Sequence, residues 1–256
     1  CMANLRHNDM CHGGQGAPLV PAYHAALAAQ LPGDEPVAVV NVGGVANITW
    51  LPAGDLATKL AGMRAFDVGP GNALIDEFVC AHTSALFDQD GAIAAQGSVD
   101  HSALEACLQH PFFLAPAPKS LDRRDFHRLP AVQMLLRSGD LHTGAATLIA
   151  LTAHAIALSE LHTPGGPGAT ARWIITGGGA RNATLLRQLS ALLNAGSTAR
   201  GRTVQTADAL GWSSAHLEAE AFAYLAVRAR QHLPLTWPGS TGVIAPVTGG
   251  QIFPLS

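Results

Sequence analysis

The chain has 256 residues, of which 48% are hydrophobic and 13% are charged, and its formal net charge is −3. A chain of this length and composition buries a substantial core, in one large domain or one and a half. Because the net charge is slightly negative, the protein has no positive field to attract nucleic acid or an anionic membrane surface, and we expect neither as a partner.

The first third of the chain predicts a helix, a hairpin, a third strand and a second helix. The first helix is begun by prolines and ended by a Pro-Gly pair. The hairpin is indicated by two β-rich runs on either side of Gly43 and Gly44. In order, these elements are expected at residues 18–31, 37–42, 45–50, 64–68 and from Asn72 onward.

The rest of the chain predicts helices that alternate with short strands, followed by a turn-rich tail from Pro234. The apolar stretch at residues 145–161 is interrupted by His154 and Glu160, so it indicates a buried helix rather than a membrane span. The helices are expected at residues 101–109, 125–137, 143–162, 182–193 and 213–232, and the strands at 172–176 and 204–206. Strands alternating with helices, together with the early hairpin, predict an α/β fold with a mixed sheet.

The hairpin turn is the first candidate binding segment. Gly43 and Gly44 stand between Asn41 and Asn47, and a tip without side chains lets backbone N–H groups approach phosphate oxygens. An ordinary hairpin turn has the same pattern, and the residues leave that alternative open.

Asp67 ends the third predicted strand and is followed by the turn Gly69-Pro70-Gly71 and a helix N-terminus. Ligands of α/β folds bind where strands end and helices begin, so a carboxylate at this place suits catalysis. Asp67 could instead cap the helix or form the turn, and this alternative stays open.

Three consecutive glycines, Gly177, Gly178 and Gly179, join a buried strand to a helix. Without side chains there, a flat ring or a phosphate can approach the backbone, as in many nucleotide-binding folds. The segment has neither the G-K-[ST] of a Walker loop nor the G-x-G-x-x-G spacing of dinucleotide-binding proteins. It therefore indicates a nucleotide only in general terms.

Arg6, Asp9 and Glu218 are candidates for binding a polar substrate. Arg6 could clamp a carboxylate and Asp9 could accept hydroxyl groups, although the segment fits an ordinary surface loop equally well. Glu218 lies two residues before another glutamate, so the two point to different sides of their helix; one could face a cleft, or both could be solvated. Ala219, Phe222, Ala223 and Ala226 are expected on the packed side.

The cysteines and histidines predict neither a disulfide framework nor a metal site. The four cysteines contain no C-x-x-C pair, which fits a reducing compartment. The 12 histidines show no H-E-x-x-H or H-x-H grouping, so we expect no transition-metal site and no metal-ligating residue.

Seven segments in series resemble the anhydro-N-acetylmuramic acid kinase family, a branch of the actin/hexokinase/Hsp70 ATPase superfamily. They are GGQGAPLVPAYH, NVGGVANIT, FDVGPGNALID, PAPKS, ITGGGARN, LEAEAFAYLAVR and STGV. The resemblance implies an α/β, actin-like (ribonuclease H-like) ATPase domain, with a mixed sheet flanked by helices and the first domain largely missing. Residues 1–36 would be a remnant of the first domain that carries a substrate-site loop. Residues 37–256 would be the second domain with a C-terminal tail.

The resemblance also implies an activity. The enzyme would use ATP, with Mg²⁺ as cofactor, and water to convert 1,6-anhydro-N-acetylmuramic acid to N-acetylmuramic acid 6-phosphate and ADP. It would act in peptidoglycan recycling in the bacterial cytoplasm, and the family suggests a homodimer. Asp67 would be the catalytic base, and Arg6, Asp9 and Glu218 would bind the sugar. The ATP and phosphate residues would be Asn41, Gly43, Gly44, Asn47, Gly69, Gly71, Gly177, Gly178 and Gly179.

Three residues depart from the family pattern, and one segment is missing. Leu5 stands where the family has Phe, Val68 where it has Thr, and Thr236 where it has Asn. The first phosphate loop, of the G-T-S-x-D-G type, is absent, so this chain alone is expected to bind ATP weakly or not at all and to be inactive. The alternatives are a non-catalytic or regulatory ATP-binding protein of the same fold, or an inactive fragment.

Overall fold

The fold is built on a five-stranded mixed sheet, seen in a computed structural model that describes residues 1–122, 124–137, 139–195 and 201–253. The strand order is β4-β3-β2-β5-β6. Strands β2, β3 and β4 are antiparallel, whereas β5 and β6 run parallel to β2. The strands are β2 (Val37–Val42), β3 (Val45–Leu51), β4 (Arg64–Pro70), β5 (Arg172–Thr176) and β6 (Thr203–Thr206). The predicted mixed α/β fold is confirmed.

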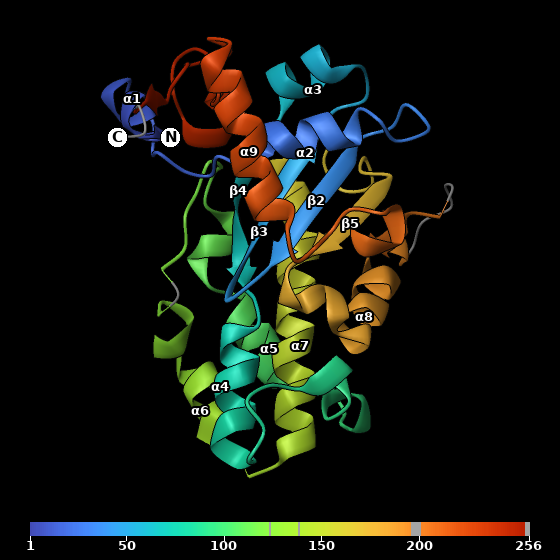
Figure 1. Cartoon of the computed structure of the whole chain (residues 1–256). Helices are drawn as coiled ribbons and strands as arrows, with labels where there is room; N and C mark the ends of the chain where they lie inside the picture. The colour runs from blue at the N-terminus through green and yellow to red at the C-terminus, as the bar shows by residue number, and fades with distance from the viewer. Residues whose placement is uncertain (123, 138, 196–200, 254–256) are drawn as a thin grey trace.

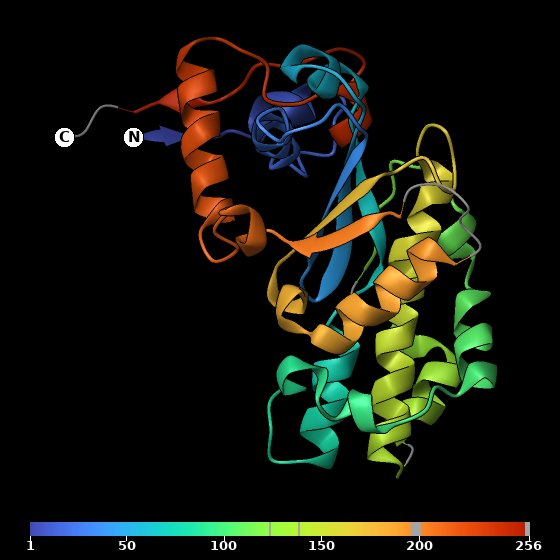
Figure 2. The same ribbon diagram turned by 90° about the vertical axis from the view of Figure 1, so that its right-hand side faces the viewer.

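Helices cover both faces of the sheet (Figures 1 and 2). Helices α2 and α9 lie over one face, called the upper face below, with α3 at its edge; α7 and α8 lie over the other, with α4, α5 and α6 packed beyond. The helices are α2 (Pro21–Ala28), α3 (Leu56–Gly62), α4 (Ala73–His82), α5 (His101–Leu108), α6 (Pro130–Arg137), α7 (Leu141–Leu158), α8 (Ala183–Asn194) and α9 (Leu217–Arg230).

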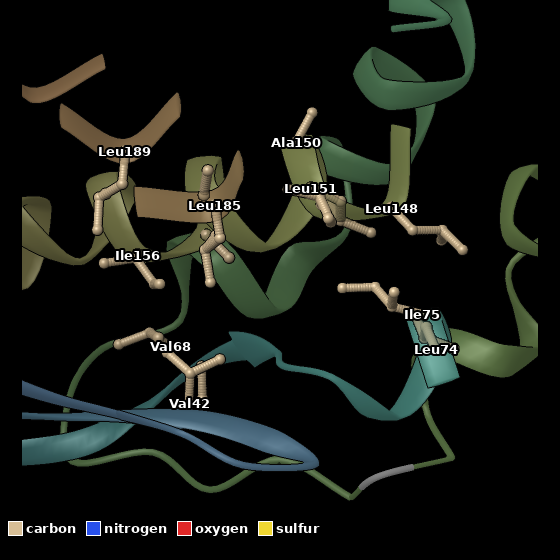
Figure 3. Close-up of a cluster of buried hydrophobic side chains, with 14 of the residues drawn as sticks. Val42, Val68, Leu74, Ile75, Leu148, Ala150, Leu151, Ile156, Leu185 and Leu189 are labelled. Carbon is tan, nitrogen blue, oxygen red and sulfur yellow. The ribbon is translucent and has the colours of Figure 1, made fainter. Parts of the chain in front are cut away.

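The strands supply two separate hydrophobic cores because successive side chains point to opposite faces of a sheet. Val40 and Val42 join the larger core beneath α7 and α8, whereas Val39 joins the smaller core beneath α2 and α9. In Figure 3, Val42 and Val68 of the sheet face Ile156 of α7. The strands are thus buried on both sides, as expected of a sheet covered by two helical layers.

Helix α7 forms the centre of the larger core. The segment Leu141–His162 is long and apolar enough to cross a membrane by length and composition, but 67% of its most apolar window is buried inside the fold. It packs on α4, α5 and α8 and on the sheet. The prediction of a buried helix over this stretch is confirmed.

Several predicted boundaries differ from the structure, and three short helices were missed, α3 among them. The helix predicted at residues 125–137 is split, because Leu129 takes an extended conformation before Pro130, as residues before proline usually do. The last long helix begins at Leu217 rather than at residue 213. Helix α3 was missed, although the Asp55 side chain caps it by accepting from the backbone N–H of Thr58.

The two ends of the chain pack against each other. Strand β1 (Met2–Ala3) pairs with β7 (Gln251–Ile252), and α1 (His7–Cys11) and α10 (Pro238–Thr241) lie nearby, so the predicted tail is more ordered than its pattern suggested. The last three residues lie outside the described part. The division at residue 36 stays a prediction. In this structure, α2 shares the smaller core with β2.

Short 3-10 helices complete the fold. They are Gln89–Gly91, Ala94–Gln96, Pro111–Leu114, Phe126–Arg128, Ser159–His162, Gly178–Arg181 and Asp208–Leu210.

Candidate active site

A row of polar residues crosses the sheet where β2 and β5 end. Asp67 of β4 is opposite Asn47 of β3, Asn47 is opposite Asn41 of β2, and Asn41 is opposite Thr176 of β5. Paired residues project on the same face, which here is the upper face under α2 and α9. The mixed sheet therefore lines up four side chains from four distant segments.

A cavity of about 440 Å³, called the main cavity below, lies over this row. Asn41, Asn47 and Thr176 line it from the sheet, and Gly177 follows at the end of β5. Its walls come from the segment before α2, from α2 itself and from the start of α9. Apolar wall residues include Leu19, Val20, Leu217 and Phe222. A volume in the range of small-molecule sites, with apolar walls and a polar floor, suits a compact polar ligand.

Arg6 and Glu218 bring opposite charges to the main cavity. The Arg6 guanidinium donates to the carbonyl oxygen of Gly16 at 2.8 Å, which holds it at the cavity edge. Glu218 is exposed in the first turn of α9. The packed side of α9 was predicted only in part: Phe222 packs on the smaller core and Ala226 is half-buried, but Ala219 and Ala223 are exposed. The buried positions are Leu217, Ala221, Leu225, Arg228 and Ala229.

Asp67 lines a neighbouring cavity of about 250 Å³, called the side cavity, which shares Asn47 and the Ala17-Pro18 segment with the main cavity. The backbone N–H of Leu121 donates to Oδ2 of Asp67 at 2.8 Å. Burial raises the pKa of the Asp67 carboxyl above its ordinary value, and the bond from Leu121 opposes this shift. A half-buried carboxylate with a raised pKa, beside a cavity, has the properties of a general base.

A β-bulge aims Asp67 at the cavities. The register shifts between Ala46 and Asn47, so that Val68 is the extra residue in β4. Val68 is buried in the larger core, whereas Asp67 points to the opposite face. Bulges often re-aim side chains next to active sites. The departure at Val68 therefore concerns a core position rather than a cavity wall.

Lys119 holds the segment that contacts Asp67. Its backbone carbonyl accepts from the Asp67 N–H at 2.9 Å. Its ammonium group donates to the carbonyl oxygens of Phe112 and Phe113 at 2.8 and 3.2 Å. Burial lowers the pKa of Lys119 to about 8. The PAPKS segment thus fixes the position of the Leu121 N–H through backbone and side-chain bonds.

The glycines of the hairpin tip and of the turn after Asp67 pack against each other. The N–H groups of Gly71 and Asn72 donate to the carbonyl oxygens of Gly44 and Gly43 at 3.1 and 2.7 Å. A Cβ on Gly71 would overlap the Gly43 carbonyl oxygen, and one on Gly69 would overlap Ala155 of α7. In the cavities described here, none of these four glycines lines a wall.

The triple-glycine segment behaves differently. Gly177 has a positive φ of 76° and lines the main cavity. Gly178 lines a third cavity of about 260 Å³, together with Asn72, Arg181 and Asp90. Gly179 is buried, where a Cβ would overlap Val42. Two of the three predicted glycines therefore face open space on either side of one turn.

Asp9 is not brought to the cavities described here. It is only 1% exposed. Its Oδ2 accepts from the Gly16 N–H at 2.7 Å, and its Oδ1 accepts from the Thr241 hydroxyl at 2.6 Å. Asp9 thus joins the GGQG loop to the STGV segment. Leu5 and Thr236, the other two departures from the family pattern besides Val68, do not line the cavities described here either. Leu5 packs on the smaller core and Thr236 is buried.

Four polar wall residues of the main cavity were missed in the sequence: His24, Thr49, Thr176 and Ser214. Thr49 had a usable signal, since it lies two residues after Asn47 in a strand and so projects on the same face. Ser214 had none, because it follows a loop. Among the described residues, no group of three or more His, Cys, Asp or Glu side chains is placed to hold a metal.

The chain matches a family model described as anhydro-N-acetylmuramic acid kinase over residues 1–255. A curated relative of that name from Rhodopseudomonas palustris (strain ATCC BAA-98 / CGA009) is 47% identical over 251 residues, which cover 98% of this chain and 63% of the relative. One from Rhodospirillum rubrum is 47% identical and covers 98% of this chain and 61% of the relative. The chain thus spans about 61–63% of the length of these relatives.

A solved structure, the activator of the 2-hydroxyisocaproyl-CoA dehydratase from Clostridium difficile with bound ADPNP, aligns with 80% of this chain and 68% of its own. Its TM-score of 0.46 and identity of 14% are too low to bear on function. The family match covers nearly all of the chain, and by that match the chain belongs to the anhydro-N-acetylmuramic acid kinase family.

Proposed function

We propose that the protein containing this chain is a kinase that opens the 1,6-anhydro bridge of 1,6-anhydro-N-acetylmuramic acid and phosphorylates its O6. The observation that carries the proposal is the convergence of distant parts of the chain on one cavity. Arg6, Asn47 and Glu218 line the main cavity, and the side cavity next to it contains Asp67. Segments far apart in sequence would not share a site by composition alone.

The sugar would occupy the main cavity. A carboxylate on the substrate would pair with Arg6, which lines the cavity beside polar residues of the sheet. Ring hydroxyls would bind Glu218 and the amides of Asn41 and Asn47, which supply both donors and acceptors. Asp9 would act only through the GGQG loop that it holds, since both of its carboxylate oxygens already accept hydrogen bonds.

Asp67 would act as the general base. It would take a proton from water as the water oxygen bonds to C1; the C1–O6 bond breaks, and O6 takes the γ-phosphoryl group of ATP. A positioned base contributes about 10²–10⁴-fold to such a step. Phosphorus captures the departing oxygen, so the second carboxylic acid that glycosidases need is unnecessary. The products are N-acetylmuramic acid 6-phosphate and ADP, and Asp67 returns its proton to solvent.

ATP would bind along the triple-glycine segment, with the third cavity beside Gly178 for part of the nucleotide. The N–H groups of the Asn41–Asn47 hairpin and of this segment would face its phosphates. Mg²⁺ would supply charge neutralisation on the phosphates when bound. Because Mg²⁺ takes most of its ligands from phosphate and water, a chain whose described residues offer no three-ligand protein cluster fits this role.

The reaction would place the protein in peptidoglycan recycling in the bacterial cytoplasm, where ATP is available, and the family suggests a homodimer. A regulatory ATP-binding protein is the second candidate.

The test is ADP release by the protein completed to the length of its relatives, with and without 1,6-anhydro-N-acetylmuramic acid. We expect release only with the sugar. In water labelled with ¹⁸O, the label should enter the sugar at C1 and not the phosphate. ATP turnover that is indifferent to the sugar would support the regulatory protein instead. The chain of 256 residues, assayed alongside, should show no turnover.

A further inference from the structure

Two buried polar atoms without a hydrogen-bond partner line the main cavity. They are Nε2 of His24 and Oγ of Ser214. Such atoms are rare in folded proteins because each costs the free energy of desolvation without a compensating bond. Two of them in one cavity, from segments far apart in sequence, indicate a place prepared for a ligand.

His24 is held rigidly with one ring nitrogen turned to the cavity. The residue is 4% exposed, and Nδ1 lies 2.9 Å from the Thr49 hydroxyl, which joins α2 to β3. Burial lowers the pKa of His24 to about 3, so the ring is neutral at physiological pH. His24 therefore presents a single uncharged hydrogen-bonding atom.

Ser214 is positioned by its backbone. Its N–H donates to the Asp208 carboxylate at 3.1 Å, in the turn that precedes α9. The hydroxyl also lies close enough to that carboxylate to lower the Asp208 pKa, but it makes no hydrogen bond of normal geometry and can donate to a ligand or accept from it. Apolar walls from Leu19, Leu217 and Phe222 line the same cavity.

We propose that His24 Nε2 and Ser214 Oγ bind the acetamido group of the sugar and thereby select an N-acetylated substrate. A neutral imidazole suits an amide better than a carboxylate, which Arg6 would take. An amide offers an acceptor and a donor for the two orphaned atoms, and its methyl group suits the apolar wall. This inference deepens the proposed function and rests on it.

A pair of variants separates a substrate contact from a structural role. In His24→Gln the side-chain amide nitrogen reaches the place of Nε2, whereas in His24→Asn it replaces Nδ1 and keeps the Thr49 partner. In the protein completed to the length of its relatives, we expect KM for the sugar to rise about tenfold in His24→Asn and less than threefold in His24→Gln, with kcat within twofold. A purely structural role predicts the reverse order, in both KM and thermal stability.

Ser214→Ala with Ser213→Ala as its matched control gives a second, independent measurement. Removal of an unpaired buried hydroxyl should leave Tm unchanged or raise it, yet KM for the sugar should rise severalfold. Ser213 bonds His216 at 2.8 Å outside the cavity, so its alanine variant should lower Tm slightly and leave KM unchanged. Equal KM values for both serine variants and the parent would overturn the role of Ser214.

A sugar without the acetamido group distinguishes the failure modes. With 1,6-anhydroglucose, which lacks that group, the KM penalty of His24→Asn should disappear. A penalty of the same size on both sugars would overturn the acetamido assignment. Sugar-dependent turnover with equal KM values in all His24 variants would overturn this inference alone, whereas no sugar-dependent turnover in the parent would overturn it together with the proposed function.

Discussion

Two turns in this protein have nearly the same sequence pattern, a strand followed by glycines and a helix, but different surroundings. In the first of them, at the end of β4, Gly69 and Gly71 are buried against α7 and the hairpin tip. In the turn after β5, Gly177 and Gly178 line two cavities. Glycines in strand-to-helix turns thus allow the close approach of another backbone, and in the second turn they also leave part of a cavity wall without side chains.

The difference shows where each turn can contribute chemistry. In the first turn the contribution comes from a side chain, since Asp67 borders the side cavity while its glycines pack. In the second turn the backbone itself borders the cavities at Gly177 and Gly178, although the side chains of Asn41 and Asn72 lie close to their two Cβ positions. Substitutions in the two turns should therefore affect different quantities.

The largest effect is expected from Asp67→Asn, which keeps the shape of the first turn and removes its base. Turnover of the protein completed to the length of its relatives should fall by about 10²–10⁴-fold, with little change in KM for ATP. Steady-state ADP release measures both. Asp9→Asn is the contrast: loss of one acceptor should destabilise the fold by about 1–3 kcal/mol while the folded protein still turns over. A wild-type kcat in Asp67→Asn would refute the assignment of the base.

Gly71→Ala should destabilise the fold by about 2–4 kcal/mol, because the added Cβ overlaps the Gly43 backbone, which cannot move aside cheaply. Urea unfolding followed by circular dichroism measures the change. Gly139→Ala is the matched control, since nothing lies within 4 Å of its Cβ position. If the two variants were equally stable, the packing role of the first turn would be lost and the contrast between the turns with it.

Gly178→Ala should act on the nucleotide rather than on the fold. The nearest atom to its Cβ position is Nδ2 of Asn72 at 3.1 Å, at the end of a side chain that can adjust. We expect Tm within about 3 °C of the parent, and KM for ATP raised by about three- to tenfold, which corresponds to about 1 kcal/mol. Unchanged KM together with a large loss of Tm would make the second turn a packing turn like the first.

The smallest effect is a pH dependence of stability at Asp67. Because its pKa is raised in the folded state, the native protein binds more protons than the unfolded chain between the ordinary and the raised pKa. The contribution of Asp67 to stability is thus full below its ordinary pKa and is lost as the pH rises through the raised value. The Tm of Asp67→Asn minus that of the parent should therefore increase from pH 3 to pH 7.

Asp55 provides a control of opposite sign for this measurement. The bonds from Thr58 lower the pKa of its carboxyl, so its contribution to stability is present at neutral pH and is lost on acidification. The Tm of Asp55→Asn minus that of the parent should decrease from pH 3 to pH 7. The same trend in both variants would mean that the folded protein does not raise the pKa of Asp67.

Much of the fold was predictable from local patterns. The hairpin, the buried helix α7 and the strand before the triple glycine follow from alternation, turn residues and long apolar runs. The split of the helix at residues 125–137 was missed because Pro130 was taken as an interior residue instead of a helix start. The packed side of α9 was predicted only in part, because a helix rich in alanine has little contrast between its faces.

The site was less predictable, because it depends on which strands are neighbours. The sequence by itself determined that glycine turns, a strand-end carboxylate and charged residues at Arg6 and Glu218 are available. Only the tertiary structure decided that Asp67, Asn47, Asn41 and Thr176 form one row. It also decided that Asp9 accepts hydrogen bonds from Gly16 and Thr241, and that His24 turns an unpaired nitrogen to the main cavity. The physical reason is that local spacing fixes which face a side chain takes, whereas strand order and helix packing determine what it meets there.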